Sequence, residues 1–313
     1  MDRSDIFSVI ATGLSGIAGK QPQAVPTIGG SKILVSSDYT GQYGAGDYRV
    51  LSFLAVSADA GDEWERARSL VRAEVMKGDN RRISYKGMND GMVRRAIGPF
   101  LSAANLLPGL SFTVAIDNRI PTLLNDTVPP DLAHWKPKVF SSALHIAHFL
   151  SIFVAAVSSP GQNMFWITDE DDIAANERLL ADLTNVVMNI SRMYLKHRLG
   201  ALQCGTTAID GPLRQVEDFA AIPDLIVGCL NETLTRNEIC DAPISTEVMF
   251  PIRIKGIPKS KRILRWYTDM DIHPLKRLTC VIHPSEDEGQ YSAFWPQLIP
   301  VFEMRHSPYV LAA

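Results

Sequence analysis

Acidic side chains stand at the ends of several apolar, strand-like stretches in this 313-residue sequence. Asp38 closes "KILVSSD", Asp117 closes "FTVAID", and Asp169 opens an acidic run after "MFWIT". Strands of an α/β sheet end along a shared rim, so carboxylates that are distant in sequence can meet there. Divalent cations such as Mg²⁺ prefer oxygen ligands, and a pair of them can activate water and stabilise the leaving oxygen of a phosphodiester.

A further acid, Asp224, lies in the otherwise apolar stretch "AAIPDLIVGCL". Because its neighbours are apolar, we expect this carboxylate to be at least partly buried. A buried carboxylate must be paired, hydrogen-bonded or metal-bound. Pro223 directly before it leaves a second explanation open, since proline followed by an acid is also typical of the first turn of a helix.

The other acids have structural explanations too. Asp38 before Thr-Gly and Asp117 before Asn118 are typical turn formers. The run Asp169-Glu170-Asp171-Asp172 precedes a helical stretch, so one member can cap that helix and others can favour its dipole. Four adjacent acids nevertheless exceed what a cap needs, and they repel one another unless a cation is present.

The elements that must position these acids alternate between strands and helices. A strand hairpin followed by this alternation predicts an α/β fold around a mixed sheet flanked by helices. We expect residues 1–30 to be weakly structured. The expected strands cover 32–38, 48–58, 110–118, 162–172 and 199–210, with 81–87 as a short strand or extended piece. The expected helices cover 61–78, 89–107, 139–159, 173–198 and 217–236.

Composition is that of an ordinary globular protein, with 46% hydrophobic and 21% charged residues. The net charge of -3 gives no global positive field, so any nucleic-acid surface must be a local patch. The four cysteines form no C-x-x-C pair, so we expect no cysteine metal cluster or redox motif. Four scattered cysteines in a chain of this size suit a reducing, cytoplasmic setting. The N-terminus does not read as a signal peptide. The longest apolar run, 143–159, is shorter than the ~20 residues of a membrane span, and we expect a buried helix and no membrane partner.

In this order the acids resemble those of the RNase H-like superfamily. More narrowly, the sequence resembles a large uncharacterised family of bacterial and phage RNase H-like proteins. Their first strand carries Asp-Glu-Ser-Gly or similar, where "SSDYTG" stands here, and a late helix has an Ala-Asp-Leu-x-x-Gly form, which "IPDLIVG" is similar to. Between these, "ISYKG", "FTVAIDN" and "WITDED" match the family's other segments, so the resemblance covers roughly residues 32–235. Tyr39 and Pro223 depart from it, standing where the family has an acid and an alanine.

The resemblance implies a metal-dependent nuclease that hydrolyses phosphodiester bonds with Mg²⁺ or Mn²⁺. Asp38, Asp169 and Asp224 would be the central ligands, with Asp171 or Glu170 as a fourth, and Lys86 would contact the scissile phosphate. It also implies an RNase H-like domain over 31–240, an N-terminal extension over 1–30 and a C-terminal extension over 241–313 packed on the same domain.

Three functional hypotheses stay open at this point. The first is the nuclease, with DNA or RNA as partner and a possible homodimer. The second is a non-catalytic RNase H-like scaffold that binds a partner protein or nucleic acid. The third is an α/β enzyme of small-molecule phosphate metabolism.

Basic and histidine residues supply further candidates. The basic clusters 81–86, 93–95 and 259–265 can track a nucleic-acid backbone, with Tyr85 or Trp266 available for base stacking, although charge runs are more often solvated surface. His145 and His148 share one helix face, a spacing that suits a metal, but no H-E-x-x-H pattern accompanies them. We therefore interpret both as core histidines.

Overall fold

The structure is a computed structural model that describes most of the chain. The described residues are 5–40, 46–124, 127–169, 172–236, 249–255, 259–269, 271–285 and 290–301.

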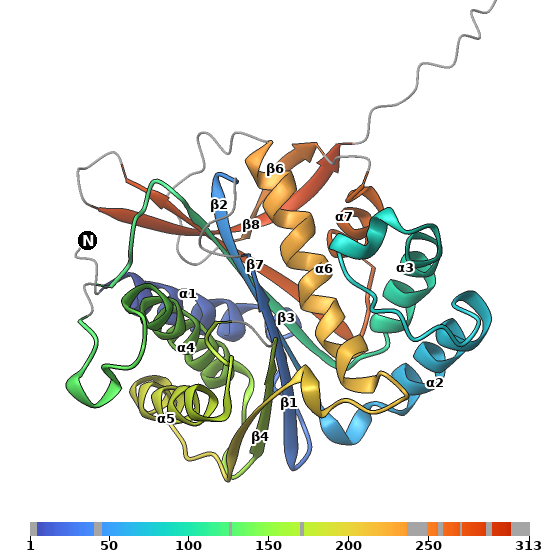
Figure 1. Cartoon of the computed structure of the whole chain (residues 1–313). Coiled ribbons are helices and arrows are strands. Elements are labelled where there is room, and N and C mark those ends of the chain that lie inside the picture. Colours follow the sequence, from blue (N-terminus) through green and yellow to red (C-terminus); the bar gives the residue numbers. More distant parts are fainter. Residues whose placement is uncertain are drawn as a thin grey trace, which may run out of the picture.

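Seven α-helices and eight strands are found in these ranges (Figure 1). The helices are α1 (Asp5–Lys20), α2 (Asp62–Leu70), α3 (Gly91–Ala104), α4 (Pro137–Val157), α5 (Glu177–Tyr194), α6 (Gln215–Thr235) and α7 (Lys261–Tyr267). The strands are β1 (Lys32–Tyr39), β2 (Tyr48–Ser57), β3 (Gly109–Asp117), β4 (Asn163–Thr168), β5 (Leu202–Thr206), β6 (Met249–Lys255), β7 (Leu275–Pro284) and β8 (Tyr291–Val301). The expected strands and helices between residues 32 and 236 are therefore confirmed in type and order, except that no strand forms over 81–87.

The described strands form one mixed sheet of order β5-β4-β1-β2-β3-β7-β8-β6. Strands β1, β2 and β3 make an antiparallel meander, while β4 pairs in parallel with β1 and β5 in parallel with β4. The described strands and helices thus form the α/β arrangement around a mixed sheet that the sequence predicts. The helical insertion, α2 and α3, lies between β2 and β3.

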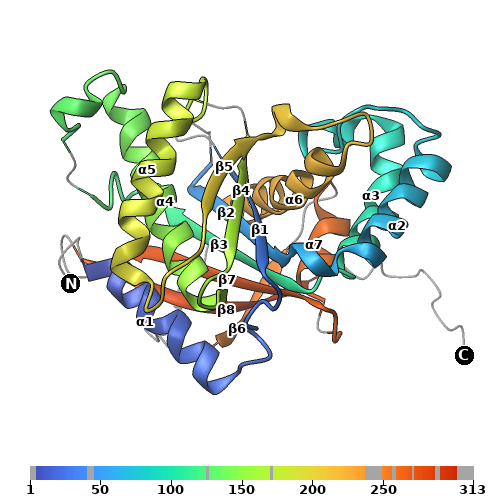
Figure 2. The same cartoon turned by 90° about the horizontal axis from the view of Figure 1, so that it is seen from below.

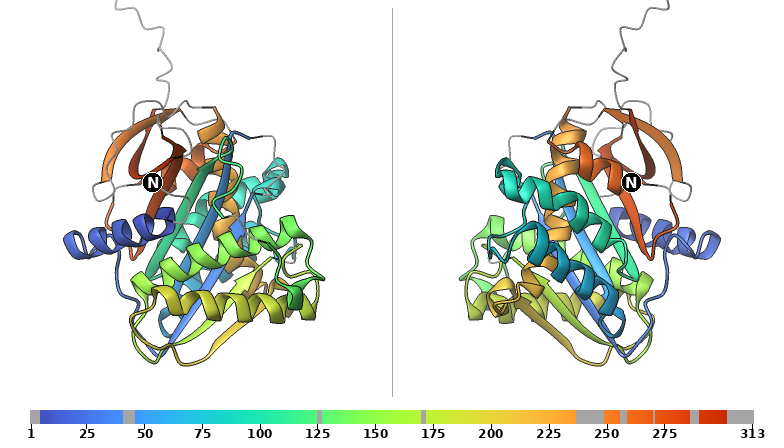
Figure 3. Two further views of the ribbon diagram at one scale, coloured as in Figure 1. Left: turned by 90° about the vertical axis from the view of Figure 1, so that its left-hand side faces the viewer. Right: turned by 90° about the vertical axis from the view of Figure 1, so that its right-hand side faces the viewer.

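Helices cover both faces of the sheet and bury a separate core on each. Figure 2 shows α1, α4 and α5 on one side of the strands and α2, α3, α6 and α7 on the other. Figure 3 presents the two helical layers in turn. Alternation along the strands supports both cores, because successive side chains point to opposite faces. In β1, for example, Ile33 and Val35 join the α4 core, while Leu34 packs against the α6 core.

The C-terminal part of the chain widens the same sheet. Strand β7 adds in parallel to β3, β8 pairs antiparallel with β7, and β6 pairs in parallel with β8. This covers the edge of β3, whose unpaired N–H and C=O groups would otherwise be exposed.

The N-terminal segment differs from the expectation for residues 1–30. Helix α1 spans Asp5–Lys20, and its apolar face, which includes Ile6, Ile10 and Leu14, lies fully inside the α4 core. The expectation of weak structure was wrong because polar residues such as Ser8 and Ser15 lie on the outer face, while the apolar residues still recur at helical spacing.

Helix α4 is, within the described residues, the one helix long and apolar enough to cross a membrane by length and composition. Most of it is buried inside the domain, against α1, α5 and the sheet. Packing within the domain thus accounts for its apolar composition, in line with the predicted buried helix.

Truncating the buried face of α1 tests whether this helix belongs to the core. The side chain of Ile10 is 0% exposed, so Ile10→Ala should lower the free energy of unfolding by about 2–5 kcal/mol. Chemical denaturation measures this, with Ser8→Ala on the exposed side of α1 as the control. Equal stability of the two variants would contradict the packing of α1.

Candidate active site

The register of the sheet brings Asp38 and Asp169 to the same end of two neighbouring strands. Strands β1 and β4 run in parallel, with Ser36 opposite Ile167. Both of these residues face α6, since Ser36 bonds to that helix and Ile167 belongs to its core. Two residues further along each strand, Asp38 and Asp169 point to the same face. Both carboxylates are half-buried.

Helix α6 carries the third predicted acid across this face. The Ser36 hydroxyl donates to the carbonyl oxygen of Phe219 (3.4 Å), and the side-chain amide of Asn231 donates to the carbonyl of Tyr48 (2.6 Å). The helix therefore runs in the direction of β1, from the level of Ser36 toward the start of β2. Asp224 lies between these two contacts, alongside the end of β1.

Pro223 lies in the interior of α6, so the first-turn explanation for Asp224 was wrong. A proline has no N–H to donate to the carbonyl four residues earlier, which here is that of Phe219. The Ser36 hydroxyl bonds to this same carbonyl. Ser36 thus bonds to the carbonyl that Pro223 leaves without its helical donor and fastens α6 to β1, two residues before Asp38.

Asp224 is a half-buried carboxylate that is only partly compensated. Its Oδ2 accepts a hydrogen bond from the backbone N–H of Tyr85 (2.6 Å). Burial raises the pKa of Asp224, and the charge of Asp169 adds to this, while Arg82 and Lys86 oppose it. These influences show that Asp169, Arg82 and Lys86 all lie within electrostatic range of Asp224.

A glycine one turn along α6 makes the Tyr85 contact possible. A Cβ at Gly228 would lie 2.2 Å from Cγ of Tyr85, so only glycine leaves room for this ring. The ring is buried against α6, with the Lys259 ammonium 4.1 Å from its centroid. The spacing Asp-x-x-x-Gly therefore places the Asp224 carboxylate and the glycine that makes room for Tyr85 one turn apart on the same side of the helix.

Arg82 is a site residue that the sequence did not single out. Its Nη2 donates to Oδ1 of Asp169 (2.9 Å), and the charges of Asp169, Glu217 and Asp224 all raise the pKa of Arg82. The cluster 81–86 resembles the solvated charge runs of ordinary surfaces, and nothing in its spacing distinguishes Arg82. Only the position of the loop shows that its guanidinium meets the acids.

Glu217 is a second such residue. It lies seven residues before Asp224 on α6, hence on nearly the same side of the helix. Its Oε1 pairs with Arg214 (2.7 Å), while Oε2 is buried without a hydrogen-bond partner among the described atoms. Burying a carboxylate oxygen without a hydrogen bond costs folding free energy. Glu217 therefore places a second, incompletely paired carboxylate on the Asp224 side of α6.

The remaining predicted site residues are Lys86 and the acids that follow Asp169. Lys86 is exposed at the start of the short helical turn Lys86–Asn89, and no strand forms over 81–87. Glu170 and Asp171 lie outside the described residues. The expectation that the acidic run caps the next helix was not confirmed for its described members, because Asn176 caps α5.

Asp117 proves to be structural. It is buried, bonds to the side chain of Arg119 (2.7 Å) and pairs with Nδ1 of His283 (3.2 Å). The turn interpretation also holds, since the backbone N–H of Arg119 donates to the same carboxylate (2.8 Å).

The aromatic and histidine candidates are likewise part of the core. Tyr85 and Trp266 are 5% and 7% exposed, so the expectation that either is available for base stacking was wrong. Both rings are covered by cations, Trp266 by Arg277. His145 is buried and accepts from the backbone N–H of Leu123 (3.2 Å), as expected of a core histidine.

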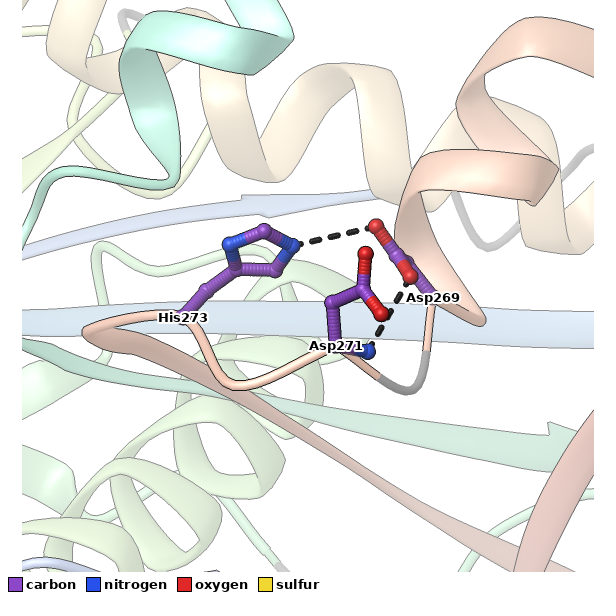
Figure 4. Close-up of side chains that lie close together, drawn as sticks. All are labelled: Asp269, Asp271 and His273. Carbon is purple, nitrogen blue, oxygen red and sulfur yellow. Dashed lines mark hydrogen bonds and ion pairs between the residues drawn. The ribbon is translucent and has the colours of Figure 1, made fainter.

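A separate group of metal-ligand types lies at the other end of the sheet. Asp269, Asp271 and His273 are, in the described ranges, the one trio whose ligand atoms all fall within 4.8 Å of one another (Figure 4). His273 Nε2 bonds to Asp269 (3.0 Å), and the backbone N–H of Asp271 donates to the same carboxylate (3.1 Å). The hydrogen bonds from His273 and from the backbone of Asp271 hold the pKa of Asp269 below its usual range. Local pairing thus accounts for the trio, and none of the predicted ligands belongs to it.

The predicted acids fit a hard divalent cation by their chemistry. All are oxygen donors, which Mg²⁺ and Mn²⁺ prefer. Burial raises the pKa of Asp224, and Oε2 of Glu217 is buried without a hydrogen-bond partner among the described atoms, so a bound cation would stabilise the ionised carboxylates.

No protein-family model and no curated protein matches the sequence. Among solved structures, the chain is similar to the crystal structure of the ribonuclease H2 from Pyrococcus horikoshii OT3. The two chains are 8% identical, the match covers 77% of this chain and 90% of that chain, and the TM-score is 0.36.

Adding a methyl group at Gly228 tests the Tyr85 contact. Gly228→Ala should displace the ring and lower the free energy of unfolding by about 1–3 kcal/mol, because the core there has no room. Loss of the Tyr85 hydrogen bond should also raise the pKa of Asp224 further, which carboxyl-carbon NMR titration measures. Gly19→Ala in α1, where a Cβ meets nothing within 4 Å, is the matched control and should not destabilise the protein.

Neutralising Asp224 should stabilise the protein at neutral pH. A carboxyl whose pKa is raised on folding stabilises the folded state while protonated, and this contribution is lost as pH rises through the folded-state pKa. Asp224→Asn, which can still accept from Tyr85, should therefore resist urea better than wild type at pH 7. The advantage should shrink as pH falls toward about 4, the ordinary aspartate range. A variant less stable than wild type at pH 7 would contradict a raised pKa of Asp224 in the folded protein.

Proposed function

We propose that this chain is a divalent-metal-dependent nuclease that hydrolyses phosphodiester bonds. The observation that supports it best is the convergence of acids on one face of an RNase H-like sheet. Asp38 and Asp169 end adjacent parallel strands there, and Asp224 faces them from α6 with its pKa raised by burial. The carboxylates are held by different elements, so their convergence is a property of the fold and not of local sequence.

The proposed roles follow from position and charge. Asp38, Asp169 and Asp224 would hold Mg²⁺ or Mn²⁺, with Glu170 or Asp171 as a further ligand. A bound cation would supply an activated water and stabilise the leaving oxygen. Tyr85 keeps the Asp224 carboxylate in place through its backbone N–H. The exposed ammonium of Lys86 would meet a substrate phosphate as a point charge.

A non-catalytic scaffold is the second candidate, and one contact favours it. In this structure Arg82 forms an ion pair with Asp169, so a protein cation already stands beside a proposed ligand. Tyr39, at the position where the resembled family has an acid, bonds through its hydroxyl to Thr168 and packs against the α4 core. It thus fixes the ends of β1 and β4 without adding a carboxylate to the α6 face.

Nuclease assays with Mg²⁺ or Mn²⁺ on single-stranded, duplex and hybrid substrates decide between these candidates. We expect cleavage by the wild type and a loss of about 100-fold or more in Asp38→Asn, because a ligand carboxylate is removed. Circular dichroism should show an unchanged fold.

Asp131→Asn is the control, since Asp131 is exposed in the connector before α4 and belongs to none of the elements that carry the three acids. It should cleave like wild type. Equal activity of Asp38→Asn and wild type would reject the nuclease, as would the absence of cleavage of every substrate by the wild type.

A further inference from the structure

The segment 79–86 lies over the acid site and is anchored at both ends. Arg72 Nη1 donates to the carbonyls of Asp79 (3.3 Å) and Arg81 (2.8 Å), at the start of this segment. At the other end, Tyr85 bonds through its N–H to Asp224. The backbone that carries Arg82 is therefore held on both sides of this residue.

A buried ion cluster fixes the first anchor. The carboxylate of Asp218, 0% exposed, accepts from Arg68 Nη1 (2.8 Å) and Arg72 Nε (2.9 Å). This joins α2 and the turn that follows it to the start of α6. Because charges buried in this way are costly to separate, the anchor for segment 79–86 is a firm one.

The side chain of Arg82 contrasts with its fixed backbone. It is 46% exposed, and the Asp169 carboxylate that it pairs with is 40% exposed. Ion pairs at this exposure contribute little, so the guanidinium can leave Asp169 at small cost and without a backbone movement. Arg82 nevertheless lies in the combined field of Asp169, Glu217 and Asp224.

We propose that Arg82 takes the place of a cation in the metal-free acid site and becomes a phosphate-binding residue when a divalent cation displaces it from Asp169. This inference rests on the proposed function. The guanidinium is planar and carries paired N–H donors, which suit a phosphate as well as a carboxylate. Lys86 stands four residues along the same segment and its charge also acts on Asp224, so both cations would be available to the substrate backbone.

Two measurements with opposite expected signs test this role. Arg82→Gln should bind Mn²⁺ about 3- to 10-fold more tightly than wild type, because a competing positive charge is removed. The same variant should bind a single-stranded oligonucleotide in Ca²⁺ about 3- to 10-fold more weakly, because a phosphate contact is lost. Mn²⁺ binding is followed by the electron paramagnetic resonance signal of the free ion, and oligonucleotide binding by fluorescence anisotropy.

The controls separate Arg82 from general charge effects. Arg81→Gln removes the same charge one residue away, where the side chain pairs with Asp79 and Asp90 instead, and should leave the affinity for Mn²⁺ unchanged. All variants carry His273→Ala, which removes the second potential metal site. Thermal unfolding without metal verifies that each variant folds.

The outcomes distinguish this inference from the proposed function. Mn²⁺ binding that is lost in Asp38→Asn but equal in wild type and Arg82→Gln would overturn only the role of Arg82. Unchanged oligonucleotide affinity in Arg82→Gln would also overturn it, since Arg82 would then make no contact with a phosphate after it leaves Asp169. Absence of Mn²⁺ binding in both wild type and Arg82→Gln would overturn the metal site and this inference together.

Discussion

A carboxylate half-buried on an apolar helix has an electrostatic cost that its surroundings must offset, and Asp224 sets this condition for the whole candidate site. The features around it each reduce that cost. The backbone of Tyr85 donates a hydrogen bond, Gly228 lets Tyr85 come close enough to do so, and Arg82 and Lys86 supply positive charge. The compensation stays incomplete, as the raised pKa of Asp224 shows. Sites that must accept a charged ligand commonly retain such an imbalance.

The alternation of side chains along β1 and β4 determines which face of the sheet the other two acids occupy. In β1, odd-numbered residues such as Val35 face α4, and even-numbered residues such as Ser36 face α6. In β4 the α6 side is taken by Ile167. A shift of one residue in either strand would move its terminal acid to the opposite face. The hydrogen bond between Tyr39 and Thr168 ties the two strand ends on the α4 side and thereby opposes such a shift.

Much of this arrangement could be predicted from the sequence because it follows from short-range patterns. The alternation of strands and helices gave the mixed sheet, and acids after apolar strands marked Asp38 and Asp169. The apolar neighbours of Asp224 correctly indicated a partly buried charge. The expectations that failed depend on distant partners. Whether an aromatic ring is free to stack depends on what covers it, and Trp266 is covered by a residue of β7.

Arg82 and Glu217 show the same limit from the opposite side. Each is an ordinary charged residue in its local sequence. The two come within range of each other and of Asp224 only because loop 79–86 folds over α6. The loop is placed there by Arg72 and Asp218, which are far apart in sequence. Helix α1 was missed for a different reason, because its interrupted outer face hides the apolar stripe that packs against α4.

Pro223 gives the site a property that a regular helix would lack. A continuous helix satisfies its own carbonyls and can slide along a sheet with little penalty from its backbone. Here the hydroxyl of Ser36 in the neighbouring strand donates to the carbonyl of Phe219. This bond holds α6 at one position along β1. A slip by one residue would move Asp224 by about 1.5 Å along the helix axis and would break this bond. One internal hydrogen bond of α6 is thus replaced by a bond to β1, and this bond sets the position of Asp224 relative to the end of β1.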